Sequence, residues 1–186
     1  MDSQTLLIVG VAVVILLLGL AAWAYTSRRR RVNLRERFGP EYERAVEAVG
    51  PERADSVLRA RAERVSRFNL RKLTQDQTDA FAREWRRIQS RFVDDPDGAV
   101  GEADQLVTQV MTARGYPLED FDQRTADLSV DHPVVVQNYR TARTLAMRRQ
   151  RGEAGTEEMR QAVVNYRTLV EELLAVDTRD ANRRAS

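Results

Sequence analysis

The residues best suited to chemistry surround the only histidine of the chain. Four carboxylates lie close to it in the sequence, and the whole group consists of Glu119, Asp120, Asp127, Asp131 and His132. An imidazole beside carboxylates could orient a general base or share a metal ion. However, His132 directly precedes Pro133. This local sequence is also typical of the start of a helix, with Asp131 or His132 as its N-cap. We expect the cap, and treat the five residues as a candidate functional surface.

The usual catalytic motifs are missing from the rest of the sequence. No P-loop, GxGxxG, GxSxG or HExxH pattern is present, and the chain has no cysteine. A second acidic group, Asp94, Asp95 and Asp97, lacks the further ligands of a calcium loop and is expected to cap a helix. The sequence therefore predicts no catalytic residue, no cofactor and no metal site.

Four arginines recur on the outer side of the segment that contains Trp85. They are Arg83, Arg86, Arg87 and Arg91. Such a cluster could bind an acidic partner, but a solvated helix face is the simpler interpretation. The aromatic residues on the other side, Phe81, Trp85 and Phe92, have the spacing of a helix core.

From Leu34 onward the sequence predicts one helix after another, because Gly and Pro separate amphipathic stretches and no alternating β-branched run occurs. Helices are expected over 41–49, 52–70, 75–92, 96–114 and 117–128, and from 133 and 156 onward. Thr74 with Gln77 predicts a capping box, Asp95 and Thr156 predict N-caps, and the segment 129–132 is expected to break the helical path. The fold class is therefore all-α.

The 20 residues from Leu6 to Tyr25 carry no charge and are apolar apart from two glycines. At about 1.5 Å per residue a helix of this length spans the hydrocarbon core of a bilayer. The four arginines that follow, Arg28, Arg29, Arg30 and Arg31, predict by the positive-inside rule that the N-terminus lies outside and the remainder in the cytoplasm. Trp23 and Tyr25 would then lie at the inner membrane interface, and the arginines could also contact anionic lipid.

A cleavable signal peptide is the alternative for this segment, because Ala22 and Ala24 form an A-x-A pattern. That interpretation predicts a secreted protein. It is opposed by Asp2 and by the absence of a basic residue before the apolar run. We therefore expect a single-pass protein of a bacterial inner (plasma) membrane.

The charge of the chain argues against a nucleic-acid partner. The formal net charge is +2, and residues 28–31 account for it, since the part from Val32 onward is close to neutral. A nucleic-acid-binding domain would instead concentrate basic charge on a folded face.

Several segments resemble those of a group of uncharacterised bacterial proteins with one N-terminal membrane span and a helical C-terminal domain. The matching segments are 37–42 (RFGPEY), 85–89 (WRRIQ), 91–96 (RFVDDP), 114–121 (RGYPLEDF) and 127–133 (DLSVDHP). The resemblance implies a helical architecture and a bacterial membrane, but no activity, cofactor or catalytic residue.

Together these features predict a transmembrane anchor at 1–27, an arginine-rich helical stalk at 28–73, a bundle of four main helices and one short helix at 74–175, and a disordered tail at 176–186. The expected function is that of a membrane-tethered, non-enzymatic interaction or scaffold protein with a protein partner. The alternative is a small ligand or metal sensor, or an enzyme, that uses His132 and its acidic neighbours.

Overall fold

The computed structural model describes residues 18–19 and 32–184, with side chains as far as residue 175. These residues are largely helical and include no β-strand, which confirms the all-α class. The described residues fall into two compact units, which divide between Leu58 and Arg59. Each unit is described by itself below.

The described part of the first unit contains helix α2 (Pro40–Val49) and the first half of α3 (Pro51–Ser66). The helix predicted at 41–49 is confirmed, whereas the helix predicted at 52–70 ends at Ser66. The Tyr42 hydroxyl donates a hydrogen bond to Oδ1 of Asp55 at 3.2 Å and so joins the two helices. Phe38 and Leu58 of this unit are fully buried.

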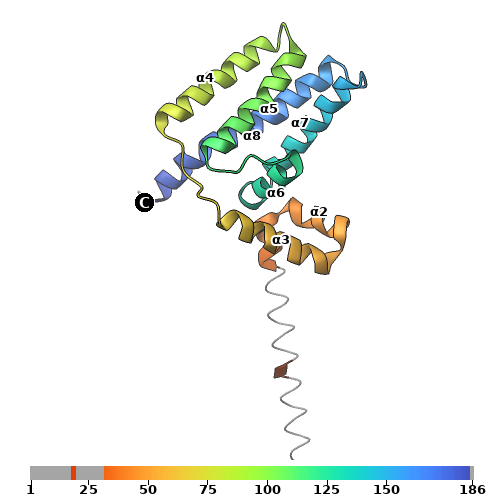
Figure 1. The fold of residues 1–186 in the computed structure, drawn as a ribbon, viewed down its shortest axis with the longest axis vertical. Coiled ribbons are helices and arrows are strands. Elements are labelled where there is room, and N and C mark those ends of the chain that lie inside the picture. Colours follow the sequence, from red (N-terminus) through yellow and green to blue (C-terminus); the bar gives the residue numbers. More distant parts are fainter. Residues whose placement is uncertain (1–17, 20–31, 185–186) are drawn as a thin grey trace, which may run out of the picture. The chain divides into compact units, whose positions relative to one another are not determined.

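The second unit contains five further helices (Figure 1). They are α4 (Gln75–Arg91), α5 (Pro96–Ala113), α6 (Phe121–Asp131), α7 (Val135–Gln150) and α8 (Thr156–Arg184). Helix α8 packs most extensively against α7 and then against α5, while α4 packs on α5. The long helix α8 is therefore the element around which this bundle is built.

Local capping contacts fix where these helices begin. The Thr74 hydroxyl accepts the N–H of Gln77, and the Gln77 side chain accepts the N–H of Thr74, so the predicted capping box is confirmed. The Asp95 carboxylate accepts the N–H of Gly98 at 2.9 Å, which confirms the predicted cap of α5. Helix α8, by contrast, begins at Thr156 itself, and its capping contact comes from Glu158, which accepts the N–H of Gly155.

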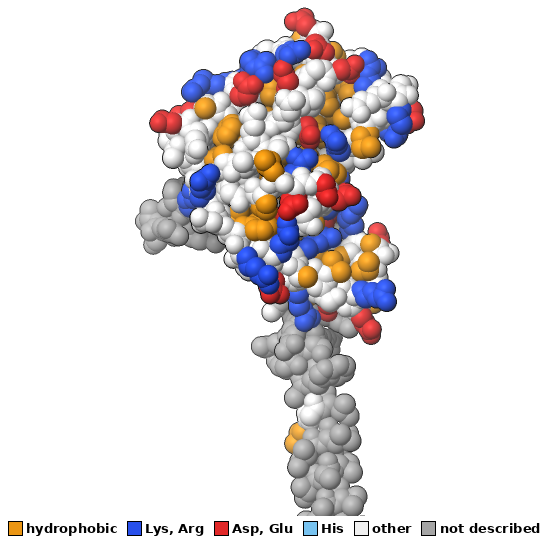
Figure 2. Space-filling view, in the orientation of Figure 1, with side chains coloured by type: hydrophobic (Ala, Val, Ile, Leu, Met, Phe, Trp, Pro, Cys, Tyr) orange, Lys and Arg blue, Asp and Glu red, His pale blue; other side chains and the backbone are white. Residues whose placement is uncertain are grey.

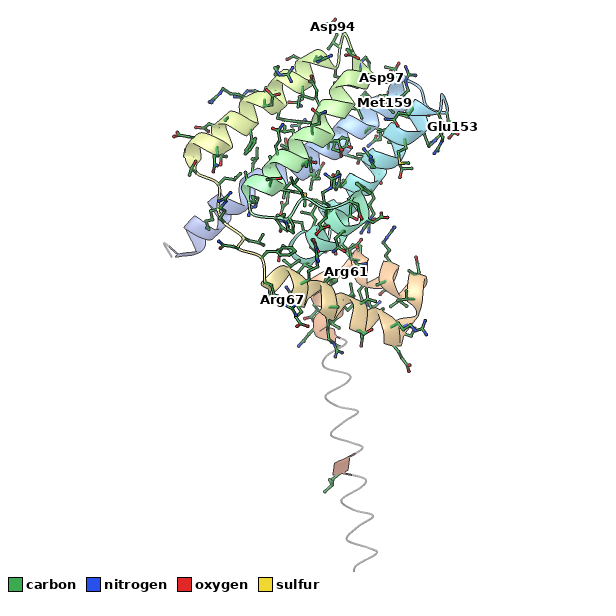
Figure 3. The ribbon with its side chains drawn as sticks, viewed as in Figure 1. Arg61, Arg67, Asp94, Asp97, Glu153 and Met159 are labelled. Atoms are coloured by element: carbon green, nitrogen blue, oxygen red, sulfur yellow. The ribbon has the colours of Figure 1, made fainter. Side chains whose placement is uncertain are left out.

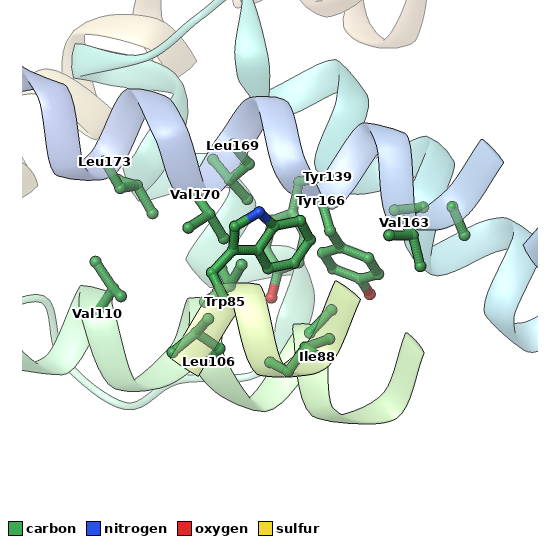
Figure 4. Close-up of a cluster of buried hydrophobic side chains, with 14 of the residues drawn as sticks. Trp85, Ile88, Leu106, Val110, Tyr139, Val163, Tyr166, Leu169, Val170 and Leu173 are labelled. Carbon is green, nitrogen blue, oxygen red and sulfur yellow. The ribbon is translucent and has the colours of Figure 1, made fainter. Parts of the chain in front are cut away.

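The core of the second unit is formed by the inward faces of α4, α5, α7 and α8 (Figure 4). Trp85 and Ile88 of α4 pack with apolar residues of α5 and α8, as their helical spacing predicts. Tyr139 of α7 and Tyr166 of α8 are fully buried and meet edge to face, with ring centroids 6.0 Å apart. The two tyrosines therefore join α7 and α8 at the centre of the bundle.

The segment that follows α3 also belongs to this unit. Leu73 is part of the buried core, and the N–H of Arg71 donates to the carbonyl oxygen of Arg114 at 2.9 Å. Gly115 lies so close to Asn69 that a Cβ at this position would approach the Asn69 carbonyl oxygen to 2.4 Å. Residues 59–73, predicted as part of a stalk, thus pack on the bundle.

Two of the predictions concern the ends of the chain, the C-terminal tail and the N-terminal anchor. Helix α8 continues to Arg184, so residues 176–184 are helical where the sequence predicted a disordered tail at 176–186. The predicted anchor lies outside the described residues except for Leu18 and Gly19, as do the interface residues Trp23, Tyr25 and 28–31.

The described helices contradict the predicted location in an inner membrane. None of them is both long enough and apolar enough to cross a lipid bilayer. This finding contradicts the prediction of a single-pass inner-membrane protein with a cytoplasmic C-terminal domain, because that location depended on a membrane span.

Candidate functional site

The five residues of the candidate functional surface are distributed over separate contacts. Asp127 lies on α6 with only 2% of its side chain exposed, and its Oδ1 accepts hydrogen bonds from Nε of Arg64 at 3.1 Å and from Nε2 of Gln123 at 2.8 Å. The other end of the Arg64 guanidinium binds Oε1 of Glu119 at 3.0 Å. The hydrogen bond to Glu119 and the charge of Asp127 raise the pKa of Arg64. Arg64 therefore joins two of the predicted residues into an ion-pair network.

Asp120 and Asp131 take part in helix and side-chain contacts. Asp120 is the N-cap of α6, where its carboxylate accepts the N–H of Gln123 at 2.9 Å. Asp131 accepts the Tyr116 hydroxyl at 3.2 Å. Burial, and then the charge of Asp131, raise the pKa of Tyr116. Both carboxylates therefore have structural partners.

The predicted role of His132 as a helix start is wrong. Helix α6 runs through 129–131, where the sequence predicted a break, and His132 is its C-cap, with an N–H that donates to the Leu128 carbonyl oxygen. The imidazole is 4% exposed, and its Nδ1 lies 3.6 Å from Oε1 of Glu172 on α8. Burial lowers the pKa of His132, while the charge of Glu172 opposes this shift. Glu172 is 40 positions further along the chain, and no local sequence signal connects it to His132.

Metal binding receives no support from this arrangement. Within the part of the chain that the structure describes, no group of three or more His, Asp or Glu side chains could hold a metal ion. The arginine cluster on α4 is also partly neutralised, because Arg87 binds Glu84 and Glu102 while Arg91 binds Asp95 and Glu102. These hydrogen bonds raise the pKa of both arginines.

A cleft with a volume of about 400 Å³ opens between α5, α7 and α8, where the sequence predicted no site. Asp104 lies in it with an 18% exposed side chain, and its two oxygens accept the Tyr166 hydroxyl at 3.2 Å and Nη1 of Arg143 at 3.3 Å. Burial, and then the charge of Asp104, raise the pKa of Tyr166. The only local signal of this cleft is Gly101, which leaves a gap on one face of α5.

A second depression, shallower and more apolar, has a volume of about 470 Å³. It is lined by Arg71, Thr108, Gln109, Thr112, Ala113 and Leu118. Leu118 is 70% exposed at its edge. We call this depression the Leu118 groove.

Comparison with protein-family models, with curated proteins and with solved structures gave no match. The resemblance seen in the sequence therefore stays a prediction.

Proposed function

We propose that this chain is a non-enzymatic interaction protein that binds a protein partner at the Leu118 groove. The observation that carries the proposal is the 70% exposure of Leu118 beside a largely apolar groove. Single exposed leucines are common on protein surfaces, but an exposed leucine that borders a largely apolar groove gives a partner a continuous apolar surface to bury. The physiological process and the name of the partner are left open.

The neighbourhood of Leu118 indicates which partner chemistry fits. Arg71 lines the groove, and its Nε donates to the Ala113 carbonyl oxygen at 2.8 Å, which holds the guanidinium at the groove. The face shown in Figure 2 carries small groups of apolar side chains separated by charged ones. An apolar core with a charged rim is typical of transient protein interfaces. The expected partner segment therefore presents an apolar side chain to the groove and an acidic one to Arg71.

The alternative function, a sensor or enzyme that uses His132, has less support. The imidazole is buried with its Nδ1 3.6 Å from Glu172, and the four neighbouring carboxylates each have a structural contact. A substrate would have to reach an imidazole that is only 4% exposed. The alternative would regain support if His132→Asn abolished a ligand-dependent phenotype without any change in stability.

The proposal can be tested by affinity purification of the full chain under mild conditions, with bound proteins identified by mass spectrometry. We expect a stoichiometric partner that is lost with Leu118→Glu. Val93→Glu is the matched control, because Val93 is 82% exposed in the turn between α4 and α5 and does not line the groove. A partner retained equally by both variants would contradict the proposed surface.

A further inference from the structure

The cleft between α5, α7 and α8 has the dimensions of a small-molecule site. Its volume of about 400 Å³ falls within the range of roughly 300 to 1,000 Å³ that ligand pockets occupy. Val100, Ala146 and Met159 lie in its wall, and apolar atoms form about half of the surface that the wall exposes. Met159 of α8 and Asp97 of α5, which both line the cleft, are labelled in Figure 3. An apolar group of a few carbon atoms would therefore find matching surface here.

The cleft stays open because α5 has a glycine at its wall. A Cβ built on Gly101 meets no heavy atom within 4 Å, so a larger side chain would project into free space. Glycine in a helix interior costs about 1 kcal/mol relative to alanine. Gly101 has no positive φ that would require glycine. The backbone at position 101 therefore does not require glycine. An open cleft explains why no side chain is present there.

Charged groups of both signs line the cleft. Each oxygen of Asp104 accepts one hydrogen bond, although a carboxylate offers about four acceptor positions. Arg149 binds Asp97 through Nε at 2.9 Å and the Ala154 carbonyl oxygen through Nη1 at 3.0 Å, which leaves its Nη2 hydrogens for another acceptor. A ligand ammonium could therefore bind Asp104 while a ligand carboxylate binds Arg149.

The balance of charge selects the class of ligand. Asp97 and Asp104 face Arg143 and Arg149 as two ion pairs, so the cleft is electrically balanced. A ligand with a net charge would add a charge that no group of the cleft balances, whereas a zwitterion keeps the cleft neutral. From this arrangement we infer that the cleft binds a small zwitterion, a free amino acid with an apolar side chain, through Asp104 and Arg149.

The inference is tested by isothermal titration calorimetry of the full chain with L-leucine, L-methionine and L-phenylalanine, each titrated separately. Two truncated probes, 4-methylpentanoic acid without the amine and 3-methylbutylamine without the carboxylate, test whether both charges are needed. We expect saturable binding of at least one amino acid and affinities at least about tenfold weaker for the matching truncated probes. No saturable binding of any of the three amino acids, or equal affinity for a truncated probe, would overturn the inference.

Two variants locate the binding site. Gly101→Leu fills the cleft without removing a contact, and it should abolish binding while the unfolding midpoint stays the same or rises. Arg149→Gln should weaken amino-acid binding at least about tenfold. Arg160→Gln is its control, because Arg160 pairs with Glu157 on the exposed side of α8 and does not line the cleft. Binding that survives in Gly101→Leu, or that responds equally to both arginine changes, would place the ligand elsewhere and refute the inference.

Discussion

Asp127 is held between Arg64 and Gln123 in a buried position. We predict that Asp127→Asn lowers the free energy of unfolding by about 1 to 3 kcal/mol, because a buried group loses charge-assisted hydrogen bonds. Urea denaturation measures this change. Glu63→Gln is the comparison, since Glu63 pairs with Arg67 where both side chains are about 70% exposed, and it should have a much smaller effect. Equal effects would show that the Arg64 network does not stabilise the fold.

The lowered pKa of His132 makes the free energy of unfolding depend on pH. The folded-state pKa is lowered below the ordinary value of 6.5, first by burial and then by Arg114, while Glu172 and Asp131 act in the opposite direction. The unfolded chain therefore binds the proton more readily, and stability should fall as the pH drops through and below about 6.5, by at most about 1.4 kcal/mol per pH unit. Urea denaturation at a series of pH values measures this slope.

The contribution of His132 can be isolated because the chain has no other histidine. Its imidazole proton resonance should titrate in the folded protein with a midpoint below 6.5. His132→Asn should remove the part of the pH slope that belongs to this residue. A midpoint at or above 6.5, or an unchanged slope in the variant, would contradict the lowered pKa that burial gives this imidazole.

Two glycines both have a positive φ but differ in the space available for a Cβ. Comparing them distinguishes the cost of backbone strain from the cost of a steric clash. Gly115 has a φ of +92° and lies against the Asn69 carbonyl, whereas Gly152 has a φ of +73° and meets nothing within 4 Å of a Cβ. We predict that Gly115→Ala costs about 2 to 4 kcal/mol of stability and Gly152→Ala about 1 kcal/mol. Thermal and urea unfolding of both variants measure the difference, and similar costs would refute the close approach to Asn69.

At the scale of the helices, the start of α4 depends on one pair of side chains. Thr74→Ala removes the hydroxyl that accepts the N–H of Gln77 and should cost about 1 kcal/mol. Thr144→Ala is the control, since the Thr144 hydroxyl only donates to the Arg140 carbonyl within α7 and alanine is the better helix former. Circular dichroism during urea denaturation gives both values. A loss of stability that is no greater for Thr74→Ala would contradict the capping role.

The helix starts that could be predicted from the sequence are those encoded within four residues. Thr74 with Gln77, and Asp95 before Pro96, contain both the donor and the acceptor of the cap. The end of α6 was mispredicted because Pro133 suggests a break, whereas the burial of Leu128 and Val130 keeps residues 129–131 helical. Burial against other helices is a tertiary effect that a local pattern does not contain.

The candidate site was harder to predict than the helices, because its contacts join residues that are far apart in the sequence. The acidic residues of the candidate surface lie on or just before α6, but Asp127 contacts Arg64, 63 positions earlier, and His132 lies beside Glu172 of α8. Asp104, Arg143 and Tyr166 come from three helices and form a cleft only when these helices pack. Such sites depend on the fold, so motif spacing could not reveal them.

The proposed function of the whole molecule depends on contact between the surface around Leu118 and a protein partner. Leu118→Glu changes an exposed side chain and should alter stability by no more than about 0.5 kcal/mol. A loss of binding in this variant would therefore reflect the surface rather than the fold.

The most direct test is photo-crosslinking in living cells of the native host, with p-benzoylphenylalanine in place of Leu118 in the full chain. Substitution of Val93, which is also highly exposed, provides the control. The account predicts a discrete adduct between this chain and one other protein from position 118 and none from position 93. No adduct at position 118, or the same adduct from both positions, would contradict it.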